Sequence, residues 1–290
     1  MKLAVTTGNA VDEVHRQRAA QLAARFSLAG LDAALLPRRN LETMAADDDV
    51  DVFYIVRRSH EELRVPAKDG VHAESALVQP GLMPSKLQQG EQHPFVRAVR
   101  GETAGHHDDV NTLFDATLGL ANDAVHLAAL TGATVTGCEQ SAVLFALLEE
   151  GLPRIARGTP RTRSWADAAA RVSAVHGDSA EVLAGMADDA VDVVVLDPMM
   201  SRPRRSAPSF SLLRAFAVMD RASPRLLLEA RRVARRRVVF KLGKGAPLPM
   251  NRSIEFPRVL TGAHVVYWVH EKHEDAVFDD DDVRPPTPRL

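Results

Sequence analysis

The sequence is poor in cysteine, in net charge and in long apolar runs, and each shortage excludes a class of protein. Cys138 is the only cysteine among the 290 residues, so the chain cannot form an internal disulfide or a cysteine zinc cluster. No apolar run approaches the roughly 18 residues that a membrane span needs. The formal net charge is −2, which argues against non-specific coating of nucleic acid by the whole surface. We therefore expect a soluble, cytoplasmic protein without a membrane partner.

The composition that remains is that of an ordinary globular protein, but its charges are unevenly distributed. Hydrophobic residues make up 46% and charged residues 26% of the chain, which excludes a largely disordered protein. Between Arg202 and Lys244 the basic residues outnumber the acidic ones by eleven, so the rest of the chain is acidic. A basic zone on a nearly neutral protein indicates a specific site for an anionic partner.

Residues 1–105 predict a small N-terminal α/β module followed by a linker. Residues 2–6 form a short apolar run typical of a strand, and residues 11–28 have the apolar spacing of a helix. Residues 51–56 are rich in β-branched and aromatic side chains, which favours a second strand. Prolines and glycines are frequent in residues 65–105 and indicate a loop-rich connection.

Residues 106–270 alternate between strand and helix patterns and predict a second, larger domain. Strands are expected at residues 112–117, 133–139, 171–176, 191–196 and 237–242, with a final antiparallel strand within residues 264–269. Helices are expected at residues 123–130, 142–150, 180–186 and 223–236. Nearly continuous apolar strands are typical of sheets covered on both faces, so the pattern predicts an α/β fold with a doubly wound parallel sheet. The acidic, proline-rich residues 271–290 predict a disordered tail.

Acidic residues follow four of these strands, at the edge of an open parallel sheet where ligands bind. Gly119 allows close approach of the backbone, and the helix beginning at Asp123 directs its N–H groups to the same place. Glu139 follows Gly119 by twenty residues, the spacing at which an acid accepts hydrogen bonds from a ribose diol. Asp178 could accept from an adenine amino group, and Asp197 ends the fourth strand. Each acid alone could instead cap a helix, and the glycine loop could be a tight turn.

The chain lacks the loop that binds nucleotide phosphates. Residues 242–245, Leu-Gly-Lys-Gly, do not match a Gly-Lys-Ser/Thr phosphate loop. Acceptors for a diol and an amine without a phosphate cradle suggest an adenosine ligand that carries no phosphates. This points to S-adenosylmethionine (SAM).

Two motifs give the sequence a specific resemblance. Residues 112–245 resemble the class I SAM-dependent methyltransferases, which have a Rossmann-like sheet, and within them the RsmJ/YhiQ family of small-subunit rRNA guanine-N2 methyltransferases. Residues 115–120 followed by Asp123 resemble the family's D-A-T-x-G-L-G-x-D, and residues 196–199 resemble its L-D-P-M. Residues 233–241 are similar to its fifth strand region. The resemblance implies rRNA methylation, with SAM as cofactor and RNA of the small ribosomal subunit as partner.

The resemblance also implies which residues form the site. We predict cofactor contacts from Asp115, Thr117, Gly119, Asn122, Asp123, Glu139, Gln140, Asp178, Ser179 and Asp197. Two positions depart from the family pattern. Ala121 and Asn122 stand where the family has glycine followed by arginine or serine, and Met200 stands where it has an aromatic residue. An aromatic side chain there would stack on a target base, so the second departure bears on the substrate.

The chemistry asked of the protein is small, because the sulfonium already activates the methyl group. Asp197 and the carbonyl of Pro198 are the predicted catalytic groups, which accept the N–H bonds of a guanine N2 amine. Whether Asp197 contacts only the cofactor stays open. We expect substrate contacts from Met199 and from three arginines that suit RNA phosphates, although these could form a solvated loop instead. These are Arg202, Arg204 and Arg205.

Other candidates favour structural interpretations. His106 and His107 lack the spacing of a metal site, so no metal is expected. Cys138 is expected to be buried, and the arginines at 231, 232 and 235–237 to form a solvated helix end. The leading hypothesis is a methyltransferase acting on rRNA. The alternatives are a methyltransferase acting on DNA or another substrate, and a SAM-binding module without activity.

Overall fold

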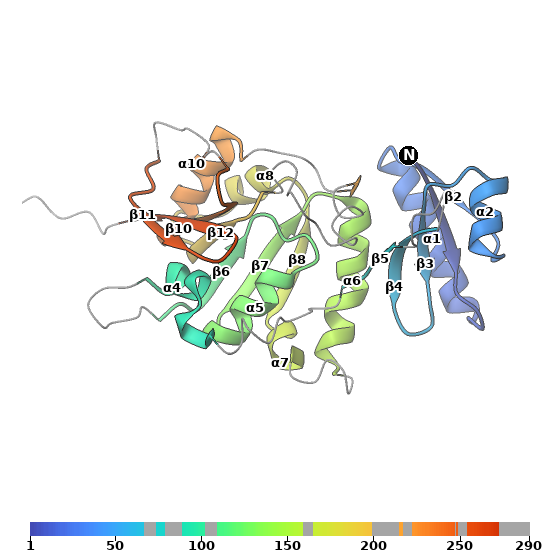
Figure 1. Cartoon of the computed structure of the whole chain (residues 1–290), viewed down its shortest axis with the longest axis horizontal. Helices are drawn as coiled ribbons and strands as arrows, with labels where there is room; N and C mark the ends of the chain where they lie inside the picture. The colour runs from blue at the N-terminus through green and yellow to red at the C-terminus, as the bar shows by residue number, and fades with distance from the viewer. Residues whose placement is uncertain are drawn as a thin grey trace, which may run out of the picture.

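The chain forms two β-sheets that follow each other in sequence (Figure 1). A computed structural model describes residues 1–66, 74–78, 89–101, 109–158, 165–198, 215–216, 222–246, 248 and 254–272. The N-terminal sheet has five strands and the C-terminal sheet has seven. The predicted domain boundary near residue 105 falls outside the described residues. So does the predicted tail of residues 271–290, except for Glu271, which belongs to the last strand of the sheet, and Lys272. Within these residues, no helix is long and apolar enough to cross a bilayer.

The N-terminal sheet has the strand order β2-β1-β3-β4-β5, in which β2, β1 and β3 are parallel. Its elements are β1 Lys2–Thr7, α1 Glu13–Leu28, β2 Asp32–Leu35, α2 Leu41–Asp47, β3 Val52–Val56, β4 Glu61–Val65 and β5 Glu74–Ala76. Val5 packs in one core cluster with Phe26 of α1, whereas Ala4 packs in another with Met44 of α2. Because successive residues of a strand face opposite sides, the two helices cover opposite faces of the sheet.

The C-terminal sheet has the strand order β11-β12-β10-β9-β6-β7-β8. Its strands are β6 Thr112–Asp115, β7 Thr134–Glu139, β8 Val172–His176, β9 Val191–Leu196, β10 Ala234–Gly243, β11 Arg258–Thr261 and β12 Val265–Glu271. The five strands β10, β9, β6, β7 and β8 lie side by side in this order and are parallel, and β12 is antiparallel to β10, as the sequence predicts. The chain runs outward from β6 in one direction and then returns to β9 on its other side. The space outside the carboxyl ends of β6 and β9 is therefore the switch point of the sheet, where ligands bind in such folds.

Helices cover both faces of this sheet (Figure 1). They are η1 Gly90–Gln92, α4 Pro94–Arg100, α5 Asn122–Thr131, α6 Ala142–Ala156, α7 Ala166–Ala169, α8 Ser179–Ala184 and α10 Pro224–Val233. Val193 and Val195 of β9 pack in the cluster that contains α5 and α6, whereas Val194 and Leu196 pack with α8 and α10. This alternation confirms the doubly wound architecture predicted from the apolar strands.

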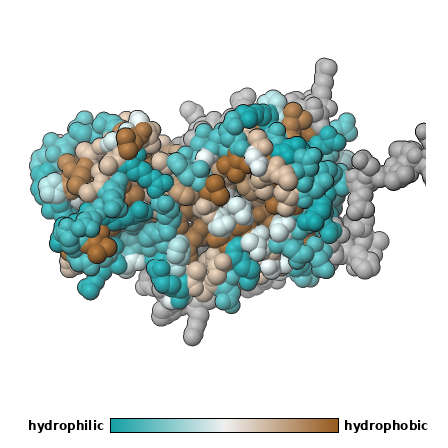
Figure 2. All heavy atoms as spheres, turned by 180° about the vertical axis from the view of Figure 1, so that it is seen from behind, coloured by the Kyte–Doolittle hydropathy of each residue, from teal (hydrophilic) through white to brown (hydrophobic). Residues whose placement is uncertain are grey.

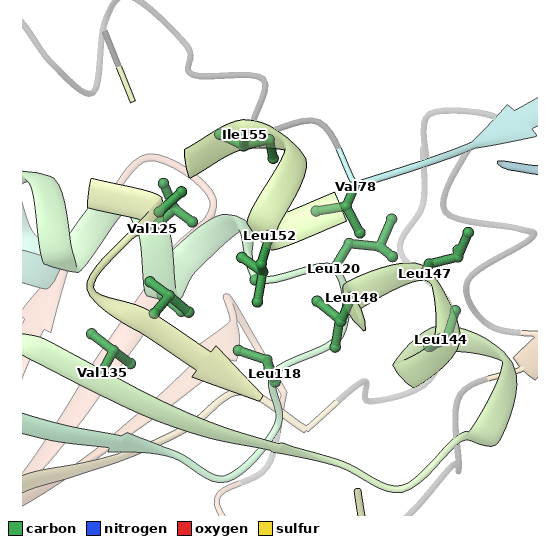
Figure 3. Packing of buried hydrophobic residues seen from close by; sticks show 14 of the residues in the cluster. Val78, Leu118, Leu120, Val125, Val135, Leu144, Leu147, Leu148, Leu152 and Ile155 are labelled. Atoms are coloured by element: carbon green, nitrogen blue, oxygen red, sulfur yellow. The ribbon is translucent and has the colours of Figure 1, made fainter. Parts of the chain in front are cut away.

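The loop after β6 is anchored in the larger core cluster. Leu118 and Leu120 point into the cluster, which the leucines of α6 close from one side (Figure 3). Gly137 of β7 lies directly under Leu118, where a Cβ atom would come within 2.4 Å of the leucine Cδ1. The packing thus fixes the loop from Asp115 to Ala121 against the sheet.

Two sequence expectations are wrong at the level of single elements. Residues 65–105 contain β5, η1 and α4, because Pro94 occupies the first turn of α4, where proline is tolerated, rather than marking a loop. Helix α10 ends at Val233, and residues 234–236 already belong to β10. Strands β2, β4 and β11 and helices α2 and α7 were not expected.

The two sheets meet at α6. Arg25 of α1 donates to Glu149 at 2.6 Å, and the backbone N–H of Glu61 donates to Glu150 at 3.3 Å. Glu61 is buried beneath Arg18, which donates to it at 3.0 Å. The surface away from the viewer of Figure 1 is hydrophilic over much of its rim, with apolar residues gathered near the middle of the larger part (Figure 2). Leu35, at the end of β2, is one of the few large apolar side chains that are half exposed among the described residues.

Candidate active site

The acidic strand ends predicted from the sequence lie along one edge of the C-terminal sheet. Asp115 ends β6 opposite Gly137 of β7 and Val195 of β9. The loop after β6 leads to α5, whose first turn carries Asp123, and β9 leads directly to Asp197. The carboxyl groups of Asp115, Asp123 and Asp197 are close enough that the last two raise the pKa of the first. The structure thus brings these three acids together.

Lys241 is the cation of this edge, and it was not among the predicted site residues. Its ammonium group donates to Asp197 Oδ2 at 2.6 Å and forms a short ion pair with Asp123. Burial lowers the pKa of Lys241, but the two carboxylates more than offset this and raise it well above the usual value. The ring of Phe95 on α4 lies 5.8 Å below the ammonium group. The signal in the sequence was a lysine between the apolar residues Phe240 and Leu242.

Thr117 links the ends of β6 and β9. Its backbone N–H donates to Asp115 Oδ1 at 2.9 Å, and its hydroxyl accepts from the backbone N–H of Asp197 at 2.7 Å. Asp115 is almost completely buried, and this burial, with Asp123 and Asp197 nearby, raises its pKa to about 7. Near neutral pH this carboxyl group therefore changes its protonation state.

Glu139 is held by the backbone on both sides. Its Oε2 accepts from Gly119 N–H at 2.9 Å, and its Oε1 accepts from Ser141 N–H at 2.7 Å. Burial raises the pKa of Glu139 to about 7 despite these hydrogen bonds. Gly119 has φ +55°, and a Cβ there would meet only a backbone oxygen at 4.0 Å. The space in front of this glycine is open, so a ligand could approach the loop and Glu139 together.

Asp178 and Ser179 have structural roles that the sequence left open. Asp178 Oδ1 caps α8 by accepting from the N–H groups of Ala180 and Glu181 at 2.9 and 3.1 Å. The hydroxyl of Ser179 donates to the carbonyl of Ala116 at 2.6 Å, which joins α8 to the end of β6. The cap uses one oxygen of Asp178, so a ligand contact through the other is compatible with it.

Some of the remaining predicted site residues lie within the described residues, and the others lie outside them. Asn122 begins α5 after Ala121, whose φ is +58°, and Gln140 is exposed after β7. Pro198 is buried directly after Asp197. The predicted substrate contacts lie outside the described residues, as does Met200; they are Met199, Arg202, Arg204 and Arg205.

Of the arginines predicted to form a solvated helix end, only Arg231 and Arg232 lie on a helix, in the last turn of α10. Arg235, Arg236 and Arg237 lie on the strand, where the first two pair with the buried carboxylate of Asp192. Arg237 is buried and donates to Glu271 at 2.8 Å. Cys138 is buried, as expected. Over the described ranges, no group of three or more potential ligand side chains could hold a metal ion.

The raised pKa of Asp115 gives a pH-dependent prediction for stability without ligand. The native state holds a proton on Asp115 up to about pH 7, whereas the unfolded chain releases it near its ordinary value. This contribution to stability is complete at low pH and is lost as the pH rises through 7. Asp115→Asn keeps Oδ1 as an acceptor and removes the charge, so it should stabilise the protein more at pH 8 than at pH 5. Each unit of pKa difference corresponds to about 1.4 kcal/mol.

Urea unfolding at both pH values measures this difference. Asp188→Asn changes an exposed acid and serves as the control, for which we expect little pH-dependent change. An equal effect of Asp115→Asn at pH 5 and pH 8 would contradict the raised pKa.

Comparison with known sequences identifies a family. The sequence model described as "Putative SAM-dependent methyltransferase" matches residues 77–257, more than half of the chain. Ribosomal RNA small subunit methyltransferase J of Laribacter hongkongensis is 45% identical over 155 residues, which cover 52% of each chain. The protein of the same name from Desulfotalea psychrophila is 31% identical over 194 residues, covering 63% of this chain and 69% of that one. The chain thus spans about half the length of the Laribacter relative.

The fold also matches a solved structure. The crystal structure of a SAM-dependent methyltransferase from Neisseria gonorrhoeae aligns with a TM-score of 0.59 and 22% identity, covering 92% of this chain and 95% of that chain. This likeness confirms the class I, Rossmann-like fold. The chain belongs to the RsmJ-like family of SAM-dependent methyltransferases, whose cofactor is S-adenosylmethionine.

Proposed function

We propose that this protein transfers a methyl group from SAM to an exocyclic base nitrogen, guanine N2, of small-subunit ribosomal RNA. The observation that carries the proposal is the ion-paired Asp197 at the switch point, beside the loop that joins Gly119 to Glu139. The names of the curated relatives support rRNA as the substrate. This observation also favours an enzyme over a module that only binds SAM, because Asp197 is partly exposed at the place where a substrate would enter.

The residues at this edge fit SAM chemically. Glu139 offers a carboxylate in a buried position where a ribose diol would otherwise lack acceptors. The carboxyl groups of Asp115, Asp123 and Asp197 lie together at the end of β6, where their negative charge would favour a cationic ligand. SAM supplies a methyl group activated by its sulfonium charge.

The protein's own residues then act on the nucleophile. The lone pair of a guanine N2 amine is delocalised into the ring, which makes the amine a poor nucleophile. We infer that Asp197 and the carbonyl of Pro198 accept its N–H groups and direct the lone pair toward the methyl group. Lys241 fixes Asp197 through Oδ2, and Thr117 fixes its backbone, so Lys241 and Thr117 are positioning residues.

The role of Glu139 is tested by cofactor binding. Glu139→Ala removes the proposed diol acceptor from a buried site, so it should weaken SAM binding about tenfold or more. Calorimetry on the folded variant measures the affinity, and Glu42→Ala, an exposed acid on α2, is the control. Unchanged affinity for the Glu139 variant would remove the ribose assignment.

The role of Asp197 is tested by separating turnover from binding. If Asp197 orients the amine in the transition state, Asp197→Ala should lower kcat by about a hundredfold, the scale of a positioned polar group, and weaken SAM binding far less. Methyl transfer from labelled SAM to small-subunit rRNA and calorimetry measure the two effects, with Asp188→Ala as a control. Equal losses in turnover and affinity would make Asp197 a cofactor contact only.

The role of the arginines after Pro198 is tested by the salt dependence of RNA binding. Each phosphate contact releases counterions and adds about 0.7 to 0.9 to the slope of log affinity against log salt. Replacing Arg202, Arg204 and Arg205 together by alanine should weaken RNA binding, flatten that slope by about two, and leave SAM affinity intact. The affinity of both proteins for RNA is measured across a salt series. Parallel slopes would show that these arginines form only a solvated loop.

A further inference from the structure

A cavity lies at the end of the N-terminal sheet, far along the chain from the methyltransferase site. It has a volume of about 640 Å³ and lies at the carboxyl ends of β1 and β2. Its walls are the loop of residues 7–11 between β1 and α1, Arg16 and Ala19 of α1, and residues 35–38 after β2. This volume is within the range of about 300 to 1,000 Å³ that small-ligand sites occupy.

The position of the cavity is that of a ligand site in α/β folds. The strands β2, β1 and β3 are parallel in this order, and α1 and α2 cover opposite faces. The connections that follow the neighbouring strands β1 and β2 therefore leave the sheet on opposite sides, and ligands bind outside the carboxyl ends of strands at such a point. The antiparallel β4 and β5 extend the far side of this sheet and leave the parallel edge unchanged.

The cavity carries a guanidinium group whose charge is not neutralised locally. Arg38 donates from Nε to the side chain of Asn9 at 3.2 Å and from Nη1 to a backbone carbonyl at 2.6 Å, both neutral acceptors. No carboxylate of the described residues forms an ion pair with it. Burial and the positive charges of Arg57 and Arg64 lower the pKa of Arg38. An anion bound beside Arg38 would relieve this repulsion.

The neighbouring charges do not cancel this surplus. Arg16 lines the opposite wall and donates to Glu13 at 2.8 Å, so that pair is neutral. Arg57, packed behind Gly8, is paired with Glu62, and Glu42 is the acid that acts on Arg38 from a distance. The cavity is therefore positive at the Arg38 side.

The other wall is apolar. Leu35 ends β2, Leu36 and Pro37 follow it, and Ala19 of α1 also lines the cavity. Leu35 is half exposed although it lines the cavity, which makes it available to a flat apolar group. A ligand that suits both walls carries an anionic group for Arg38 and a planar, weakly polar part for the leucine wall.

We propose that this cavity binds a 5′-phosphorylated ribonucleotide, with the phosphate at Arg38 and the base against Leu35 and Leu36. A guanidinium group suits a phosphate because its N–H groups form a planar fork. The nucleotide is either a free nucleoside monophosphate or a residue within an RNA chain. The proposal does not depend on methyl transfer, because the site shares no residue with the edge that holds Asp197.

Two arginines that are neighbours in sequence allow a matched test. Arg38→Gln removes the unneutralised charge, whereas Arg39→Gln removes an arginine that is paired with Asp47 and Asp48 outside the cavity. Each protein is titrated with 5′-AMP, GMP, CMP and UMP, with inorganic phosphate, and with a short single-stranded oligoribonucleotide. SAM affinity is measured alongside, so that a failure of the methyltransferase site is seen separately.

We expect a mononucleotide or the oligonucleotide to bind about tenfold more weakly to the Arg38 variant, the scale of one charge-assisted contact, and normally to the Arg39 variant. Binding of the mononucleotides identifies a free nucleotide as the ligand, and binding of the oligonucleotide alone identifies RNA. Equal binding to both variants, or no binding of either probe to the wild type, overturns the proposal.

A second variant tests the apolar wall without touching the charge. Leu35→Ser changes a half-exposed side chain, so we expect the fold to be kept. It should weaken nucleotide binding several-fold and leave the affinity for inorganic phosphate unchanged. If phosphate alone binds as tightly as the nucleotides, the cavity is an anion site without a base pocket, and the proposal is wrong.

Discussion

The ion pairs of the Lys241 ammonium group with Asp123 and Asp197 are the interactions on which the edge of the larger sheet depends. The ammonium group joins the end of β9, through Asp197, to the first turn of α5, through Asp123. Burying a charge costs several kcal/mol unless it is paired with good geometry, and here two carboxylates meet one cation. Removing it would take away the ion-pair partner that these two carboxylates share beside Asp115. The distance between the helix and the strand end, and with it the shape of the site, therefore follows from one side chain of β10.

The larger domain could be predicted from the sequence because its strands are covered on both faces. Residues 191–196 are almost entirely apolar, and the structure sends their side chains alternately to two separate cores. That pattern is typical of a parallel sheet with helices on both sides, in which the carboxyl ends of the strands meet at one edge. The acids that follow those strands could accordingly be grouped before the structure was known. Asp178 also shows the limit of such grouping, since its position serves the cap of α8 as well.

What could not be predicted are contacts between segments that are distant in sequence. Lys241 stands in an apolar strand, and only the fold reveals that α5 and β9 bring carboxylates to it. Helix α4 begins with a proline inside a segment rich in loop residues. Its Phe95 nevertheless stacks on Tyr267, with 4.9 Å between the ring centroids, and the Lys241 ammonium group lies over the Phe95 ring. Short strands such as β2, whose residues are half exposed, carry too little alternation to be distinguished from a loop. In each case tertiary packing decides what local pattern leaves open.

The charges at the switch point link cofactor binding to the protonation of Asp115. Asp115, Asp123 and Asp197 lie together at this edge, and Lys241 pairs with the last two, so full ionisation would concentrate negative charge there. With a pKa of about 7, Asp115 relieves part of this excess by holding a proton. On the proposed function, the sulfonium of SAM brings a second positive charge, which favours the ionised form of a neighbouring carboxyl group. Cofactor binding and loss of a proton from Asp115 are then linked, and the ionised carboxylate of Asp115 serves as a counter-charge to the sulfonium.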